Sequence, residues 1–100
     1  MPTSTAVVHT DAARRYAKQL LAHLGHKVPV EDVDGAPHAQ RLVFAYGVGV
    51  VRPEDDRLIM EAAADDDESL AHVEDVLTRH LERFGARRAL AVSWQRSGAA

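Results

Sequence analysis

The chain has 100 residues, of which 46% are hydrophobic and 27% charged, and its formal net charge is −3. This composition is typical of one globular domain and argues against a disordered chain, a nucleic-acid arm or a basic membrane patch. There is no cysteine, which excludes disulfides and thiolate metal ligands. The start lacks a signal-peptide pattern, and no apolar run is long enough to cross a bilayer. We therefore expect a cytoplasmic single domain over 1–100, with an ordered core over 5–94, a flexible tail over 95–100, and neither nucleic acid nor membrane as partner.

The first quarter of the chain predicts a strand followed by an amphipathic helix. A β-branched run over 6–9 favours the strand. Thr10 or Asp11 can cap the helix, and Gly25 can end it in a left-handed conformation. Apolar residues between these points recur at the spacing of one helix face: Ala13, Tyr16, Ala17, Leu20 and Leu24.

Two further segments predict strands bounded by turns. Residues 27–33 contain Pro29, which cannot donate to a ladder, so this strand is expected at a sheet edge. The sequence Asp-Gly-Ala-Pro over 34–37 predicts a turn. A second turn at 53–56 leads into residues 57–63, which alternate as an antiparallel strand.

Between these turns, residues 41–52 alternate between a face of large side chains and a face of small ones. This alternation indicates strand structure, either as one strand or as two. Gly47 and Gly49 on the small face mark a bulge, a bend between two strands, or a close approach of another element to the sheet.

The last third of the chain predicts a second helix and a closing strand. The acidic run at 65–68 is suited to a helix start, where one aspartate caps and the others favour the positive end of the dipole. An apolar stripe follows and ends at Gly85: Leu70, Val73, Leu77, Leu81 and Phe84. Residues 89–94 alternate as a closing strand.

These elements predict an α+β two-layer sandwich in the order β-α-β-β-β-α-β. Each helix has a single apolar stripe, so both helices are expected on one face of a mostly antiparallel sheet of about five strands. The other face of the sheet would then be open. That open face is a candidate homodimer interface or ligand wall.

Histidine is the residue type that most suggests a site. His23 and His26 form an H-x-x-H pair at the end of the first helix, and His80 falls within the apolar stripe of the second. A buried imidazole needs a hydrogen-bond partner or a metal, and imidazole is a common ligand of zinc and iron. We therefore consider His23, His26 and His80 as metal ligands, with Glu31 as a fourth, provided that both helices point the same way, so that their carboxyl ends meet.

The alternative is that these histidines bind no metal. In that case His80 donates to a backbone carbonyl, and His23 and His26 are solvated. His9, His38 and His72 show no convergence with the others.

Other chemistry is sparse. The serines lack a nucleophile elbow, and the two glycines near residue 48 do not form a phosphate loop. The leading hypothesis is thus a small binding or accessory domain rather than an enzyme. Two alternatives remain open: a small enzyme using His80 with Glu82 or Glu31 as acid–base partners, and a structural interaction module with core histidines.

The order of motifs resembles the bacterial domain-of-unknown-function family 2218. The segments that carry the resemblance cover nearly the whole chain, and they are 4–8, 13–16, 19–20, 23–27, 61–62, 70–76, 80–84 and Trp94. The middle of the chain departs from the family pattern, since Phe44-Ala45-Tyr46-Gly47 keeps only its aromatic-glycine skeleton. His23, His26 and His80 match histidines of the family motifs.

The resemblance implies a lineage but no reaction, because the family is uncharacterised. Some relatives are joined to siderophore-interacting flavin reductases, which implies a role near iron uptake and a siderophore-utilisation protein as partner. Nothing in this chain matches the flavin-binding part, so a reductase activity is not implied.

Overall fold

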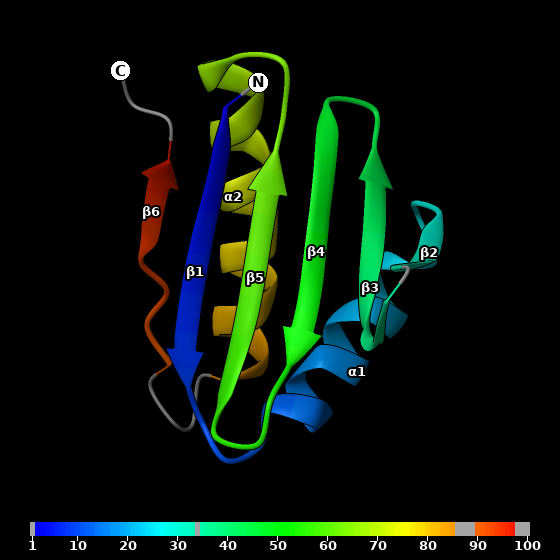
Figure 1. Cartoon of the computed structure of the whole chain (residues 1–100), viewed down its shortest axis with the longest axis vertical. Coiled ribbons are helices and arrows are strands. Elements are labelled where there is room, and N and C mark those ends of the chain that lie inside the picture. Colours follow the sequence, from blue (N-terminus) through cyan, green and yellow to red (C-terminus); the bar gives the residue numbers. More distant parts are fainter. Residues whose placement is uncertain (1, 34, 86–89, 98–100) are drawn as a thin grey trace.

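The computed structural model describes residues 2–33, 35–85 and 90–97. The elements follow in the order β-α-β-β-β-β-α-β (Figure 1). Their bounds are β1 Thr3–His9, α1 Ala13–Leu24, β2 Val30–Val33, β3 Ala36–Phe44, β4 Gly47–Pro53, β5 Arg57–Ala63, α2 Asp67–Phe84 and β6 Trp94–Ser97. The predicted α+β sandwich is confirmed, with one strand more between the helices than in the predicted order.

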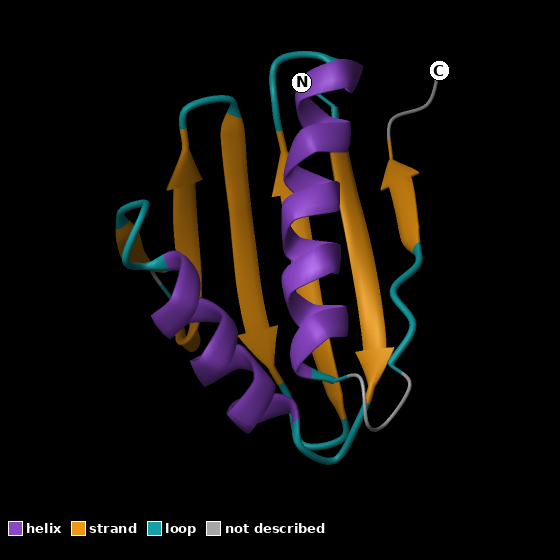
Figure 2. Ribbon diagram, turned by 180° about the vertical axis from the view of Figure 1, so that it is seen from behind, coloured by secondary structure: helices purple, strands orange, loops and turns teal. Residues whose placement is uncertain are grey.

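All strands belong to one antiparallel sheet in the order β2-β3-β4-β5-β1-β6. Both helices lie on the same face of this sheet, and α1 is inclined relative to α2 (Figure 2). As expected for a segment next to Pro29, β2 is an edge strand. None of the helices in the described residues is long and apolar enough to cross a membrane.

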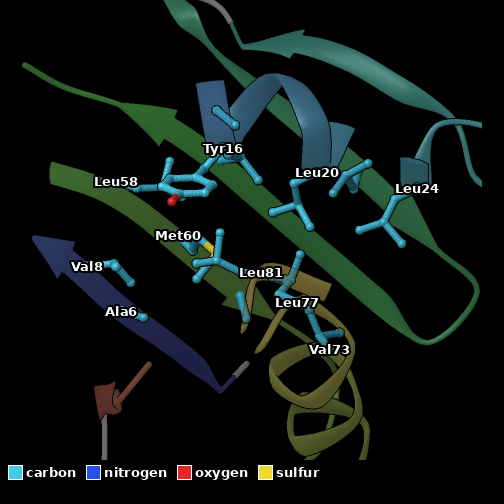
Figure 3. Close-up of a cluster of buried hydrophobic side chains, with 14 of the residues drawn as sticks. Ala6, Val8, Tyr16, Leu20, Leu24, Leu58, Met60, Val73, Leu77 and Leu81 are labelled. Atoms are coloured by element: carbon cyan, nitrogen blue, oxygen red, sulfur yellow. The ribbon is translucent and has the colours of Figure 1, made fainter. Parts of the chain in front are cut away.

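The core lies between the sheet and the two helices (Figure 3). Both predicted apolar stripes face it, with Leu20 in α1 and Leu77 in α2 fully buried. From the sheet, alternate residues such as Ala6, Leu58 and Met60 point into the same layer. Burial of these stripes is what fixes the helices on one face.

The helix ends differ in part from the expected caps. Asp66 caps α2 as predicted for this acidic run, since its carboxylate accepts from the Ser69 backbone N–H at 2.7 Å. The N-cap of α1 is Ala12 rather than Thr10 or Asp11, and the Thr10 hydroxyl instead accepts from the Ala12 backbone N–H at 3.1 Å. Gly25 ends α1, but its φ of −63° is right-handed, so the prediction of a left-handed stop is wrong.

The structure resolves 41–52 into two strands. β3 ends at Phe44, β4 begins at Gly47, and Ala45 and Tyr46 form the turn between them. The register pairs Phe44 with Gly47, so the alternation of large and small residues continues across a hairpin rather than along one strand.

The end of the chain also differs from the prediction. The closing strand is β6 at Trp94–Ser97, whereas the expected strand was 89–94 and the expected tail began at 95. Residues 90–93 have no regular secondary structure, and residues 86–89 lie outside the described part. Trp94 pairs with Ala6 of β1. Because this pairing partner lies at the other end of the chain, local alternation alone did not locate the strand.

Candidate functional site

His23 of α1 and His80 of α2 lie against each other, although the expected condition, that both helices point the same way, does not hold. Their ring centroids are 5.0 Å apart and their planes are inclined by 46°. Phe84, one turn after His80 on α2, meets the His23 ring edge-on at 5.7 Å. The helices do not run the same way, because they return from two antiparallel strands. The contact between the two rings therefore lies on the helix layer, between α1 and α2, which are inclined to each other (Figure 2).

The His80 ring is held by its own helix. Its Nδ1 lies 2.6 Å from the carbonyl oxygen of Val76, one turn earlier in α2. Because a carbonyl oxygen only accepts, Nδ1 carries the proton and donates it. In the neutral ring this leaves the lone pair on Nε2. The backbone hydrogen bond seen here is the kind that orients an imidazole whose other nitrogen binds a metal.

The electrostatic surroundings of His23 favour its neutral form. Partial desolvation is the largest cause that lowers its pKa below the ordinary value of 6.5. The positive charges of His80, Lys27, Arg83 and His26 lower it further. The neutral ring is the form that offers a nitrogen lone pair to a metal.

His26 is only loosely associated with this pair. It lies in the turn after α1, where its side chain is exposed. It is near enough to help lower the pKa of His23, although its contribution is the smallest of the causes. Within the described part of the chain, no three His, Asp or Glu side chains are grouped in a way that could hold a metal ion. The ready-made donors are therefore those of His23 and His80.

Glu31 lies on the other face of the sheet. A Cβ at Gly49 would lie 3.0 Å from Leu77 Cδ1 on α2, so Gly49 faces the helices and Val50 faces away from them. The ladder places Val50 beside Arg41, and Arg41 beside Glu31. The Glu31 carboxylate accepts from Arg41 Nη1 at 3.4 Å. The structure thus does not bring Glu31 to the histidine pair.

A second ring cluster was not foreseen from the sequence. His72 on α2 stacks on Tyr46 with centroids 3.9 Å apart and planes within 3°, and Tyr46 stacks in turn on Phe44 at 5.4 Å. Burial is the largest cause that raises the pKa of Tyr46 above its ordinary value of 10.0. The sequence indicated no partner for His72, because no local pattern relates a residue in a hairpin turn, such as Tyr46, to a residue on the solvent side of a helix.

The two glycines of β4 mark a close approach, one of the three options left open. A Cβ at Gly47 would lie 2.6 Å from the Ala63 carbonyl oxygen and 2.9 Å from Val73 Cγ2 on α2. At Gly49 the nearest atom belongs to Leu77. The missing side chains let α2 pack close to the sheet.

Three surface cavities of about 430, 490 and 530 Å³ are lined by residues other than the histidine pair. The first lies at the start of α1, near Arg14 and Asp55. The second lies beside Tyr46, and the third lies between α1 and the strand that carries His38. His23 and His80 form a surface pair rather than the wall of one of these cavities.

Comparison with known proteins gives a family without an assigned reaction. A family model described as an uncharacterised protein conserved in bacteria, DUF2218, matches residues 5–95. No curated protein matches significantly.

Two solved structures share the fold. The NMR structure of PA4090 from Pseudomonas aeruginosa is 33% identical, with a TM-score of 0.77, and the match covers 95% of this chain and 96% of that one. A de novo designed protein with a ferredoxin fold, LFR1 1, is 14% identical with a TM-score of 0.56. That match covers 100% of this chain and 90% of the designed one and concerns the fold alone.

Proposed function

This chain belongs to the bacterial family DUF2218, whose members are uncharacterised. From its own side chains, we propose that it is a small binding or accessory domain for a transition-metal ion. The ligands in this proposal are the imidazoles of His23 and His80. The observation that carries it is their 5.0 Å ring contact, together with the Val76 carbonyl that orients His80.

Two imidazoles leave most positions of a metal ion open. Zinc usually takes four ligands and iron takes up to six, so the remaining positions go to water, to His26, or to donors that arrive with the metal. An exposed site with open positions suits transient binding of a metal or of a chelated metal better than permanent storage. Some relatives in this family are joined to siderophore-interacting flavin reductases, so iron is the first metal to test and zinc the second.

The test is a titration of the whole chain with Zn²⁺, and with Fe²⁺ under anaerobic conditions, followed by NMR of the histidine rings. We expect the ring signals of His23 and His80 to change at stoichiometric metal. His23→Gln and His80→Gln should each weaken binding by at least about tenfold, the scale of losing one positioned group at a metal site. His26→Gln tests whether the third histidine joins.

His72→Gln and His9→Gln are matched controls, because these histidines lie away from the pair and should leave the affinity unchanged. Equal changes at all histidines, or none at stoichiometric metal, would contradict the proposal. If His23→Gln and His80→Gln lower only the stability of the fold, the two rings are packing groups, as in the structural alternative.

A further inference from the structure

The sheet has a second, uncovered face. Figure 1 looks directly onto it, with both helices behind the strands. Since Gly49 faces α2, its neighbours Val48 and Val50 point to the uncovered side. The ladder extends this assignment across the sheet, because residues paired side by side share a face.

Apolar side chains lie on this face in two groups, interrupted by Arg52 and Glu61. Val43, Val48, Val50 and Ala63 form one group on β3, β4 and β5, and Val7 and Ile59 form the other on β1 and β5. Val7 is 44% exposed, whereas Ile59 beside it is only 8% exposed. Apolar side chains on several neighbouring strands of an uncovered sheet face favour its use as an interaction surface.

The charges on this face are balanced and self-complementary. Arg52 Nη1 lies 3.2 Å from Glu61 Oε1, and both side chains remain about two-fifths exposed, at 40% and 42%. A second pair, Arg41 and Glu31, lies towards the β2 edge. A surface that carries both signs in neighbouring positions can pair with its own copy under a two-fold rotation, because each Arg then meets a Glu.

The size of the face favours a partner of the same size. Strands about 4.8 Å apart and rising about 3.4 Å per residue give these six strands, which are four to nine residues long, a face of roughly 600 Å². Two such faces in contact bury on the order of 1,200 Å², the lower limit of stable interfaces between proteins. A small molecule would leave most of the face exposed, whereas a second copy covers it completely.

We infer that the uncovered sheet face is the interface of a two-fold symmetric homodimer, in which Arg52 of each copy lies beside Glu61 of the partner subunit. The sheets pack face to face, with the Arg52 and Glu61 side chains of β4 and β5 near the middle of the interface and the apolar side chains beside them. The inference does not depend on the proposed metal function, because the histidine pair lies on the opposite, helical layer.

The test is sedimentation velocity of the whole chain from about 5 µM to about 500 µM, the range in which a modest interface associates. The wild-type chain is expected to shift from monomer to dimer across this range. Arg52→Glu and Glu61→Arg should each weaken the dimer by at least about tenfold, because each places like charges together twice in a symmetric interface. The double variant R52E/E61R restores opposite charges and should recover most of the affinity.

Glu82→Arg is the matched control, since it reverses one exposed charge on α2 and should leave the dimer unchanged. Circular dichroism and thermal melting of each variant check that its fold is intact. A wild-type chain that stays monomeric up to the highest concentration would overturn the inference. So would a dimer that Arg52→Glu and Glu82→Arg weaken equally, because that dimer would use another surface.

Discussion

Glu74 is an acidic side chain of α2 that folding places next to the last strand. Its carboxylate accepts two hydrogen bonds from Arg96 of β6, at 3.0 and 3.3 Å, and its side chain is only 13% exposed. Burial alone would raise the pKa of Glu74, but the hydrogen bonds from Arg96 and the charge of Arg96 outweigh it, so the pKa lies below the ordinary value of 4.5. The charged form is therefore part of the folded state.

This pair predicts a specific pH dependence of stability. Since folded Glu74 releases its proton more readily than the unfolded chain does, its contribution is present above pH 4.5 and is lost as the pH falls through the folded pKa. We expect Glu74→Gln to lower the free energy of unfolding by about 1–2 kcal/mol at pH 7, because a charge-assisted hydrogen bond is lost. Urea unfolding at a series of pH values checks this.

In that series the wild-type and Glu74→Gln curves should converge as the pH falls through the folded pKa of Glu74, below which the carboxylate is protonated in both states. Glu82→Gln on the exposed side of the same helix is the control and should parallel the wild type. A constant difference between wild type and Glu74→Gln at every pH would contradict the electrostatic explanation.

At the scale of elements, both helices were predictable almost to the residue. Their signals are local: each helix has an apolar stripe and a glycine at its carboxyl end, and α2 also has an aspartate cap. The hairpin between β3 and β4 was not, because its turn is Ala45-Tyr46 and contains none of the usual turn residues. The packing of α2 against β4 explains why glycine follows that turn, a reason that lies outside the segment itself.

Gly47 offers a test of this packing. In Gly47→Ala the new Cβ would meet the Ala63 carbonyl oxygen, a backbone atom that cannot turn aside, and Val73 of α2. We expect the variant to lose about 1–3 kcal/mol of unfolding free energy, the usual cost of overpacking. Thermal or urea unfolding measures it.

Gly35→Asn is the matched control at a glycine with free space. Gly35 has a φ of +75° and no atom within 4 Å of the position of an added Cβ, and asparagine adopts this left-handed conformation readily. Its stability should change little. Equal losses at both positions would argue that glycine flexibility, rather than contact with α2, explains the result.

At the scale of the whole molecule, the position of β6 depends on partners that are distant in the chain. Trp94 Nε1 donates to the Thr78 hydroxyl of α2 at 2.7 Å, while the backbone of Trp94 pairs with Ala6. Neither contact has a local signature. The sequence placed His23 and His80 at the faces of the two helices but gave the wrong helix directions for their contact. It also did not show the separation of Glu31, because that separation depends on strand register.

Thr78→Val tests how firmly β6 is held. The substitution keeps the shape of the side chain but leaves the half-buried indole N–H of Trp94 without its acceptor. We expect a loss of about 1–2 kcal/mol and faster hydrogen exchange in β6 than in β4. Ser93→Ala, which removes an exposed hydroxyl beside Trp94, is the control and should change neither the stability nor the hydrogen exchange of β6. If hydrogen exchange in β6 is unchanged in Thr78→Val, the indole hydrogen bond does not anchor the strand.

The place of β1 between β5 and β6 has a consequence for how the protein is made. Strands β2, β3 and β4 are each paired with the next strand in the chain, so these four strands, β2 to β5, can form successive hairpins as they leave the ribosome. β1 is made before all of them, yet its two partners emerge only later, and β6 comes last of all. During synthesis β1 therefore stays unpaired until β5 is made, and both of its edges are paired only once β6 is made.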